Sequence, residues 1–370
     1  MVAFLVGSCV GSFLNVVIYR LPIGLSVNDP NRSFCPGCKA PIPMSRNIPL
    51  VSWLWLRGKC PDCGGKISVR YFLVEGLTGF LFIATWMVVM GRAPASELAL
   101  SQLAILPVWF LISAFVAIAF IDAEHMIIPL ELSISGTVAA VLAAALQPTL
   151  PDLASIQLDR ISWLSGLKFS ALGWVIGFFG VWAIVLLGKL AFGKMKWTYD
   201  EAVPWRLEEP KNDEDPIHFH MGEDTLPWWD LFFRKSDKLV IESETLVVNG
   251  ETSQPGQVVI HGAGVILPDG KEIGIEQLQS LEGTSSSAVV PREAMGMGDV
   301  HLMGVIGAFL GPFSVMFSLG IGSLLAIIAA ILTKIGFGMR LPFGPYIIAG
   351  ALVWFFGGWR LGEWYLLAFR

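Results

Sequence analysis

Charged side chains are scarce in this chain of 370 residues. Asp, Glu, Lys and Arg make up only 15% of it, whereas 54% of the residues are hydrophobic. A soluble domain carries about a quarter charged residues, and several apolar runs here reach the roughly 20 residues needed to cross a bilayer. The composition therefore excludes an ordinary soluble protein and predicts a polytopic membrane protein.

Two sequence signals are also missing. The first apolar run, residues 2–19, has neither a basic segment before it nor a small-residue cleavage site after it, so we expect a retained anchor and not a signal peptide. No Gly-rich nucleotide loop follows a predicted strand. No residue can therefore be assigned to a nucleotide-like ligand by motif, and we expect no nucleic-acid partner.

The apolar runs predict an all-α membrane architecture with about eight transmembrane helices. The expected spans are residues 2–19, 71–91, 102–121, 131–147, 165–192, 300–311, 313–335 and 342–358. The run at 300–311 is too short to cross alone. We expect this helix to include apolar residues on either side of the run, or to start partway into the membrane.

Basic residues give an orientation. The loop 20–70 holds eight Lys and Arg residues, whereas the loops 92–101 and 148–164 hold one each. The positive-inside rule then places the loop 20–70 in the cytoplasm and both termini outside. Asp122 and Asp299 fall on the same cytoplasmic side, in an orientation that depends on basic residues alone.

Residues 193–292 have a different character. "RLEEPKNDEDP" is acidic and interrupted by Pro, which is typical of a linker. "KLVIESETLVVNG", "QVVIHGAGVILPDG" and "KEIGIEQLQSL" then alternate or cluster β-branched residues around Asn-Gly and Asp-Gly turns. The pattern predicts a small cytoplasmic β-rich insert, with "EGTSSSAVVP" as a flexible exit.

Four of the five cysteines form two Cys-x-x-Cys pairs, "CPGC" and "CPDC". They are Cys35, Cys38, Cys60 and Cys63. Two such turns complete a tetrahedral site for zinc. An iron site of the same geometry and a pair of disulfides are the alternatives, and a reducing cytoplasm disfavours disulfides. Four Cys ligands leave no open position, so we expect structural Zn²⁺.

These features divide the chain into five parts. They are a first transmembrane helix (1–20), a cytoplasmic zinc-binding loop (21–70), transmembrane helices two to five with the first candidate Asp (71–192), the β-rich insert (193–292), and helices six to eight with "GMGD" (293–370).

Two carboxylates stand at the ends of apolar runs, Asp122 in "AFIDAEHMIIPLEL" and Asp299 in "GMGD". Charged residues at membrane depth are rare and usually functional. The alternatives are an interfacial residue for Asp122 and a helix N-cap for Asp299. Two carboxylates at one depth can share a proton, so that one activates water and the other acts as an acid. The pair predicts aspartic protease chemistry.

Several neighbours are candidates for substrate contact or for tuning the pair. Gly296 and Gly298 allow an extended substrate to approach closely, or they serve helix packing. Glu124 and His125 either act on the nearby Asp or lie in a solvated turn.

Glu75 is a further candidate near the start of the second span. It is either catalytic or paired with Arg70 or a similar base.

Six stretches of the chain resemble the type IV prepilin peptidases. They are "GSFLNVVIYRLP", the four-cysteine loop with "NIPLVSWLWLRGKC", "RYFLVEGLTG", "FIDAEHMIIP", "GMGDVHLMGVIGAFLG" and "PFGPY". They run in the family's order over residues 1–192 and 292–356. "GMGD" alone is less specific, because other intramembrane aspartic proteases share a Gly-x-Gly-Asp signature.

The resemblance implies two activities in the bacterial inner membrane, with the active site facing the cytoplasm. The enzyme would cleave prepilin or pseudopilin precursors of type IV pilus and type II secretion systems after a Gly. It would then methylate the new N-terminal amine with S-adenosylmethionine, with the zinc-bearing loop taking part. Asp122 and Asp299 match the family's catalytic aspartates, and the four cysteines match its metal ligands.

The chain departs from the family pattern at three places. His301 stands where the family usually has Lys, and a neutral His would change the local pKa values. Leu130, followed by Glu131, stands where Asp or Asn is usual. The insert of about 100 residues precedes the second Asp, and it could shape substrate access, dock a partner, or have no effect on the chemistry.

Two other functions are compatible with the sequence. One is a Gly-x-Gly-Asp protease for other membrane peptides. The other is a transporter or scaffold whose aspartates bind cations or protons. Transport predicts acids in mid-span and broken helices, whereas both acids here lie at span ends, which favours the protease. The sequence predicts no oligomeric state.

Overall fold

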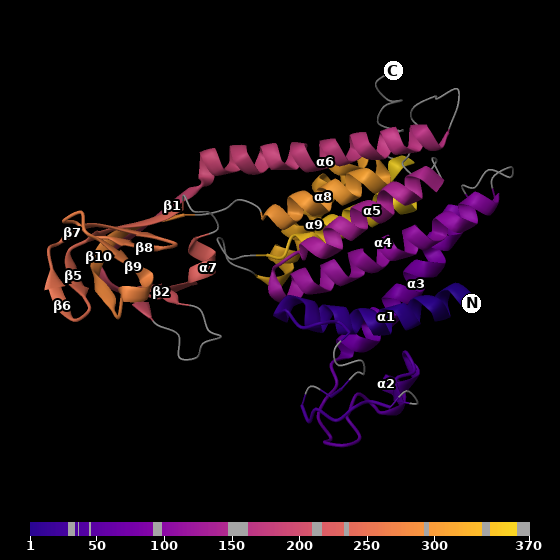
Figure 1. Ribbon diagram of the computed structural model, residues 1–370, viewed down its shortest axis with the longest axis horizontal. Helices are drawn as coiled ribbons and strands as arrows, with labels where there is room; N and C mark the ends of the chain where they lie inside the picture. Colours follow the sequence, from indigo (N-terminus) through magenta and orange to yellow (C-terminus); the bar gives the residue numbers. More distant parts are fainter. Residues whose placement is uncertain are drawn as a thin grey trace. The chain divides into compact units, whose positions relative to one another are not determined.

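The computed structural model describes residues 1–28, 34–35, 37–43, 46–91, 98–146, 162–208, 217–232, 237–291, 296–334 and 341–360. The chain forms two compact units. One contains Met1–Trp182 and Met297–Arg370, and the other contains Ala183–Gly296. The first unit is helical and the second is built mainly from strands (Figure 1).

The helical elements follow the apolar runs. Their bounds are α1 Val2–Arg20, the 3₁₀ turn η1 Leu21–Ile23, α2 Val51–Trp55, α3 Val69–Gly91, α4 Leu98–His125, α5 Leu130–Leu146, α6 Trp163–Phe192, α7 Trp228–Leu231, the 3₁₀ turn η4 Ile275–Gln277, α8 Met297–Leu310, α9 Pro312–Thr333, α10 Gly344–Val353 and the π-helical turn η5 Trp354–Gly358.

Five described helical segments are long and apolar enough to cross a membrane, judged by length and composition. They are Val2–Ile23, Arg70–Gly91, Gln102–His125, Trp163–Leu190 and Pro312–Thr333. Three further apolar helices are shorter, namely Leu130–Leu146, Met297–Leu310 and Gly344–Gly358. The predicted membrane protein with several apolar helices, a four-Cys cluster and a β-rich region is confirmed. The count of about eight spans stays a prediction.

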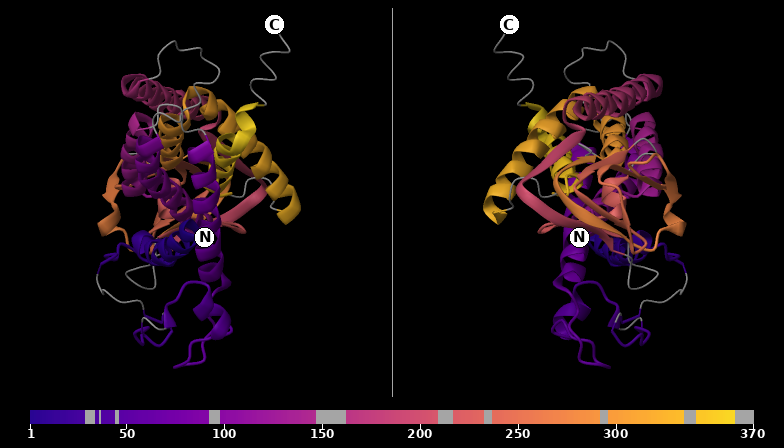
Figure 2. Two further views of the ribbon diagram at one scale, coloured as in Figure 1. Left: turned by 90° about the vertical axis from the view of Figure 1, so that its right-hand side faces the viewer. Right: turned by 90° about the vertical axis from the view of Figure 1, so that its left-hand side faces the viewer.

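The helix α4 occupies the interior of the helical unit, where it contacts α1, α3, α5 and α10. Apolar side chains along it are almost wholly buried, among them Leu111, Phe115 and Ile118. The helices α8 and α10 both pack on α9, in the orange and yellow region of Figure 2. Asp122, near the end of α4, is likewise buried, at 5% exposed.

Glycines let pairs of helices approach closely. A Cβ on Gly11 of α1 would lie 2.7 Å from the Cα of Glu75 on α3, and a Cβ on Gly79 would lie 2.6 Å from Ser8 Oγ. Between α6 and α8, a Cβ on Gly173 or on Gly307 would overlap the carbonyl oxygen of the other glycine. Small residues at such contacts replace the hydrophobic driving force that lipid does not supply.

The second unit contains ten strands. Their bounds are β1 Lys194–Glu208, β2 His218–Met221, β3 Asp224–Pro227, β4 Lys238–Ser243, β5 Thr245–Val248, β6 Glu251–Ser253, β7 Gly256–His261, β8 Gly264–Ile266, β9 Glu272–Gly274 and β10 Leu281–Pro291. The order in the sheet is β3-β2-β1-β10-β4-β7-β8-β9, and β5 pairs with β10 and β6.

Alternating burial builds the core of this sheet. Along β4, Leu239 and Ile241 are buried, and they face a core that also contains Trp205, Phe219 and Ile260. This period of two is the pattern of strands with one face on a core. The β-rich prediction for this region is thereby confirmed.

One predicted hairpin turn is confirmed and one predicted loop is wrong. Asn249 and Gly250, with φ of 51° and 82°, join β5 to β6, as an Asn-Gly turn of this type requires. The segment "EGTSSSAVVP", expected to be a flexible exit, lies instead in β10, a central strand. This strand pairs with β1 on one side and with β4 and β5 on the other. Pairing on both edges stabilises a strand whose own composition is weakly β-forming.

The first and last strands of the insert are paired with each other. Lys194 lies opposite Pro291, and the antiparallel ladder continues to Leu207 opposite Leu281, with a bulge between Thr198 and Val203. The chain therefore enters and leaves this unit at adjacent points, which is the geometry that allows a domain to be inserted into another.

Candidate functional site

The two Cys-x-x-Cys pairs form two matching turns. The backbone N–H of Lys39 donates to Cys35 O at 2.8 Å, and the N–H of Gly64 donates to Cys60 O at 2.9 Å. Lys39 and Gly64 each lie four residues after the first Cys of their pair, and both have positive φ, 60° and 70°. The second Cys-x-x-Cys turn thus repeats the first.

The four sulfurs of Cys35, Cys38, Cys60 and Cys63 lie within 4.8 Å of one another. The Sγ atoms of Cys35 and Cys63 are 3.9 Å apart. Tetrahedral zinc with Zn–S bonds of about 2.3 Å requires sulfurs about 3.8 Å apart. The cluster therefore fits a four-coordinate metal, with Cys35 and Cys60 buried and the other two exposed.

The pKa values of the cysteines also favour a bound cation. The backbone N–H of Cys38, with smaller contributions from other groups, lowers the pKa of the Cys35 thiol to about 7. The pKa of Cys38 is raised to about 12, because the lowering effect of the Ala40 N–H is outweighed by burial and by the sulfurs of Cys63, Cys35 and Cys60. The Cys35 thiol ionises easily, and its negative charge opposes ionisation of a second cysteine beside it. A bound cation is therefore needed to hold all four cysteines as thiolates.

Glu75 anchors the cysteine loop to α3. Its side chain is 8% exposed, and Oε2 accepts the backbone N–H of Leu50 at 2.7 Å. Leu50 has φ of 64° and precedes α2, whose Trp53 ring lies 5.3 Å from the ring of Phe72 on α3. A non-Gly residue with positive φ needs support from its surroundings, and the Glu75 carboxylate supplies it.

Arg70 pairs with Glu124 and not with Glu75. Arg70 Nη1 donates to Glu124 Oε2, which joins the start of α3 to the end of α4. The alternative that paired Glu75 with Arg70 is therefore wrong. His125 is exposed beside this ion pair.

Asp122 lies near the C-terminal end of α4 and is 5% exposed. Its Oδ2 accepts the backbone N–H of Gly344 at 2.8 Å. Gly344 begins α10, and first-turn N–H groups have no partner inside their own helix and carry its positive dipole end. A Cβ on Gly344 would lie 2.8 Å from Asp122 Oδ2, so only glycine permits this contact without displacement.

Asp299 is the third residue of α8 and is partly buried. Because α8 begins at Met297, Asp299 lies inside the first turn and is not the N-cap that was considered as an alternative. An acidic side chain is favourable in this first turn.

Ile128, in the turn between α4 and α5, connects the surroundings of the two aspartates. A Cβ on Gly298, the neighbour of Asp299, would lie 2.8 Å from Ile128 Cβ. A Cβ on Gly344, the partner of Asp122, would lie 3.3 Å from Ile128 Cδ1. The first turns of α8 and α10 therefore approach one side chain.

The remaining predicted residues lie around α8. The ring of His301 contacts Phe178 of α6 edge to face, with centroids 5.0 Å apart. Gly296 is exposed and precedes α8. Gly298 approaches another chain segment closely, and it faces Ile128 and not open space.

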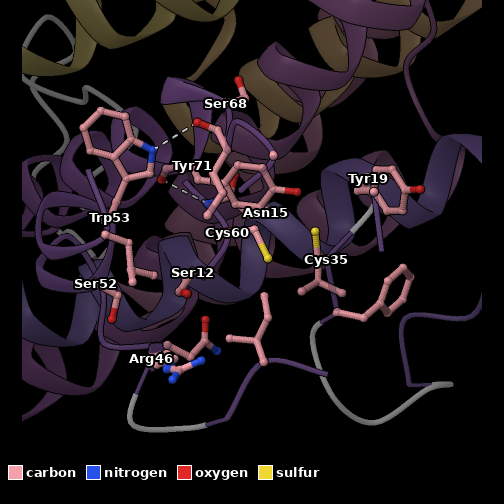
Figure 3. A pocket seen from close by; sticks show the side chains of 18 of the residues that line it. Ser12, Asn15, Tyr19, Cys35, Arg46, Ser52, Trp53, Cys60, Ser68 and Tyr71 are labelled. Carbon is pink, nitrogen blue, oxygen red and sulfur yellow. Dashed lines mark hydrogen bonds between the residues drawn. The ribbon is translucent and has the colours of Figure 1, made fainter. Parts of the chain in front are cut away.

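A cavity of ≈ 580 Å³ lies between α1, the start of α3 and the cysteine loop (Figure 3). Six of the predicted site residues line it, namely Cys35, Cys60, Cys63, Glu75, Glu124 and His125. Asp122 and Asp299 are not among its lining residues. Glu124 and His125, expected beside the aspartates, thus face the cysteine loop as well.

The groups that support the site are not evident from the sequence. Gly344 was not singled out, although "PFGPY" contains it, because nothing in a sequence shows which carboxylate a helix N-terminus will meet. Ile128 and Leu50 carry no chemical signal at all, since their roles depend on contacts with distant residues.

Two family models match the chain. The bacterial peptidase A24 N-terminal domain matches residues 5–89. The type IV leader peptidase family matches residues 259–331. The first range contains the four cysteines and the second contains Asp299, whereas Asp122 lies between them.

Curated relatives show the same similarity. The prepilin leader peptidase/N-methyltransferase of Aeromonas hydrophila is 35% identical over 222 residues, which are 54% of this chain and 68% of that protein. The protein of that name from Neisseria gonorrhoeae is 34% identical over 220 residues, 52% and 66% of the two chains. The one from Myxococcus xanthus is 45% identical over 141 residues, 38% of this chain and only 39% of the relative. No solved structure matches the chain.

Proposed function

Because the chain belongs to the prepilin leader peptidase/N-methyltransferase family, we propose that it removes the leader of prepilins with Asp122 and Asp299 as its catalytic pair. The family is one of aspartic proteases, in which leader cleavage and methylation go together. The observation that carries the proposal is the convergence of α8 and α10 on Ile128, which links the two aspartate neighbourhoods.

The chemistry needs one ionised and one protonated carboxyl group. The ionised group takes a proton from water, whose oxygen attacks the scissile carbonyl carbon. The protonated group gives its proton to the carbonyl oxygen. Collapse of the tetrahedral intermediate breaks the C–N bond. The leaving amine takes the proton that the first carboxyl group removed from water, and a hydroxyl of the intermediate returns a proton to the second carboxylate. Two close carboxyls share one proton because both cannot ionise comfortably, so the pair titrates as a unit.

The Gly344 N–H holds one oxygen of Asp122 and fixes the orientation of the carboxylate. The other oxygen of Asp122 is then left for water or substrate. Preorganised donors of this kind avoid reorganisation during reaction. His301, Gly296 and Gly298 flank Asp299. The exposed Gly296 and the half-buried His301 would contact the substrate backbone, whereas Gly298 packs against Ile128.

We assign Cys35, Cys38, Cys60 and Cys63 to a structural Zn²⁺, which the sulfur spacing supports. A metal with four Cys ligands has no open position for water, so it would stabilise the loop and take no part in cleavage. S-adenosylmethionine is the second small molecule, as the methyl donor for the new N-terminal amine.

We assign the functional groups to the predicted segments. Metal binding belongs to residues 21–70, the first aspartate to 71–192 and the second to 293–370, with the β-rich insert at 193–292. We place the enzyme in the bacterial inner membrane with its aspartates facing the cytoplasm, an orientation that rests on the basic residues of the loop 20–70. Its partners would be prepilin or pseudopilin precursors within the bilayer.

Cleavage of a synthetic peptide tests the proposal. A basic leader, a Gly-Phe junction and an apolar helix would be incubated with the purified chain in detergent, with and without S-adenosylmethionine. Mass spectrometry would compare wild type, Asp122→Asn and Asp299→Asn, with Asp200→Asn on exposed β1 as the matched control.

We expect the peptide to lose the mass of its leader with wild type and Asp200→Asn only. The cleaved peptide should gain the mass of one methyl group when S-adenosylmethionine is present. The rate should fall about 10²–10⁴-fold in each catalytic variant. An intact peptide with zinc-loaded wild type would favour a Gly-x-Gly-Asp protease for other membrane peptides. If the Asp122→Asn and Asp299→Asn variants cleaved normally, the two aspartates would not be the catalytic pair.

A further inference from the structure

The β-rich insert follows an apolar helix without a linker. The helix α6 ends at Phe192 and β1 begins at Lys194, so a single residue separates them (Figure 1). Within α6, the segment Trp163–Leu190 is long and apolar enough to cross a membrane. The last turns of α6 belong to the same compact unit as the sheet. The end of the sheet next to α6 therefore lies at the membrane surface.

A buried ion pair fixes a second strand at this end of the sheet. Lys189 Nζ, in the last turn of α6, donates to Asp237 Oδ1 at 2.8 Å. Asp237 is 5% exposed and directly precedes β4. Removing one partner of a buried ion pair leaves an uncompensated charge and is strongly destabilising. The pair therefore holds the start of β4 beside the end of α6.

Three lysines lie together at this end of the sheet, on its outer face. Lys196 of β1 is opposite Val289 of β10, and Val289 is opposite Val240 of β4. Lys194 and Lys238 each lie two positions earlier on β1 and β4, and residues two apart share a face of a strand. All three lysines are exposed, whereas the other face of the sheet forms the buried core. We call Lys194, Lys196 and Lys238 the lysine cluster.

The lysine cluster carries uncompensated positive charge. In contrast to Lys189, none of its members forms an ion pair with another residue that the structure describes. One acid on the same sheet, Glu272 of β9, is bonded instead to His261 Nε2 at 3.2 Å. His261 is the residue opposite Lys238 on β7. The cluster is therefore available to an anion outside the chain.

Acidic residues lie farther along the same strands. The insert as a whole is acidic, with 18 Asp and Glu against nine Lys and Arg in residues 193–292. On β1 the lysines are followed by Asp200 and Glu201, and on β4 Lys238 is followed by Glu242 four residues later. Four residues of a strand span about 13 Å, more than the Debye length of about 8 Å at physiological salt. An anionic surface beside the lysines is therefore largely screened from these acids.

A partly buried aromatic pair lies at the same end of the sheet. Trp228 of α7 and Phe232 have ring centroids 4.6 Å apart. A Cβ on Gly262 would lie 3.7 Å from Phe232 Cβ. Gly262 is in the β7–β8 turn and directly follows His261, which is opposite Lys238. Tryptophan is enriched at membrane–water interfaces, where its ring sits at the level of the headgroups.

We propose that the lysine cluster docks the insert on the anionic phospholipid headgroups of the membrane that α6 crosses. The ammonium groups would bind lipid phosphates, with Trp228 beside them at the headgroup level. Each Lys near an anionic surface contributes about a fivefold change in the docking equilibrium. Because α6 tethers the sheet to the membrane, the effective concentration of the headgroups is high and a weak attraction suffices. The docking fixes how the insert lies on the membrane and does not depend on peptidase activity.

Lysine footprinting of the full-length, zinc-loaded chain tests the docking. The chain would be placed in nanodiscs of phosphatidylcholine alone or of phosphatidylcholine mixed with phosphatidylglycerol, and also in detergent. Mass spectrometry would follow the rate at which an acylating reagent modifies each lysine. Lys271, exposed and directly before β9, is the internal control, since β9 lies five strands from β1 in the sheet. Soluble glycerol phosphate, added to the phosphatidylcholine discs, distinguishes a membrane surface from a free phosphate.

We expect the lysine cluster to react at least about fivefold more slowly in the discs with phosphatidylglycerol, and Lys271 to react equally in both. The protection should disappear at high salt, because the Debye length falls to roughly 3 Å at 1 M. Glycerol phosphate should give no protection. In the double variant Lys194→Gln/Lys238→Gln the docking equilibrium should fall about 25-fold, so that Lys196 becomes reactive again. Lys271→Gln is the matched variant and should keep the protection of the cluster.

Equal rates in the two kinds of nanodisc would overturn the docking. So would equal protection in detergent, which would mean that another part of the chain covers the lysines, and equal protection of Lys271, which would mean a general effect of the anionic surface on the reagent. Protection by a prepilin-like peptide where phosphatidylglycerol gives none would assign the cluster to a protein partner and also overturn the proposal. The wild-type comparison needs no variant and no cleavage, so its result is independent of the catalytic pair.

Discussion

The cysteine centre and the aspartate pair lie in the same helical unit but are held by different parts of the chain. The four cysteines fall within residues 35–63, and each turn is closed by its own backbone hydrogen bonds. Asp122 is instead held by Gly344, 222 positions away. Local geometry is specified by neighbouring residues, whereas the aspartates depend on the packing of whole helices. A substitution in one centre should therefore leave the other centre functional.

Loss of the metal is the change with the largest expected effect. It should disrupt the cysteine loop and leave cleavage by the aspartates largely intact. Structural zinc sites contribute about 10–16 kcal/mol of binding free energy, so Cys60→Ser should abolish metal retention and methyl transfer. Leader cleavage should fall less than about tenfold, since the hydrogen bond described for Asp122 comes from Gly344 and not from the cysteine loop. Zinc content by elemental analysis and the peptide assay measure both effects.

Cys9→Ser is the matched control, because Cys9 is exposed on α1 and outside the cluster. If Cys60→Ser lost cleavage as completely as methylation, the cysteine centre and the aspartate pair would not be independent.

Gly344→Ala should disturb the aspartates and leave the metal in place. The added Cβ would lie 2.8 Å from Asp122 Oδ2, which must move. Displacements of about 1 Å in a catalytic group can cost roughly 10²-fold in rate, so we expect cleavage to fall 10- to 100-fold with normal zinc content.

Gly320→Ala in α9, where a Cβ would meet nothing within 4 Å, should cleave at the wild-type rate. Equal rates for both variants would contradict the role of the Gly344 N–H.

Gly307→Ala should lower stability by forcing α6 and α8 apart. Its Cβ would overlap the carbonyl oxygen of Gly173, and such overpacking costs about 1–3 kcal/mol. Thermal unfolding in detergent should show a lower midpoint, with Gly180→Ala as the control, since a Cβ on Gly180 meets nothing within 4 Å. No shift in the midpoint would show that the two helices can separate freely.

Glu124→Gln should have the smallest effect. It breaks the ion pair with Arg70 that joins the loop side of α3 to the aspartate side of α4. Half-exposed pairs of this kind contribute about 0.2–1 kcal/mol, so both activities should change less than about fivefold. A loss as large as that of Asp122→Asn would instead place Glu124 in the proteolytic chemistry.

The chain's local patterns were predictable from the sequence alone. Apolar runs predicted the helices because each span satisfies its own backbone hydrogen bonds. Two Cys-x-x-Cys turns predicted the cysteine cluster, and Asn249–Gly250 predicted a hairpin. These features depend on residues a few positions apart. "EGTSSSAVVP" was mispredicted because its strand is formed by partners on both sides.

Only the tertiary structure decided which distant groups meet. It placed the Gly344 N–H on Asp122, Ile128 between α8 and α10, and Arg70 on Glu124 instead of Glu75. It also enclosed Glu75, Asn15 and Trp53 around one cavity. A sequence determines which residues can donate, accept or coordinate. Their partners are determined by helix packing, because the energy of each contact depends on distances set by many residues at once.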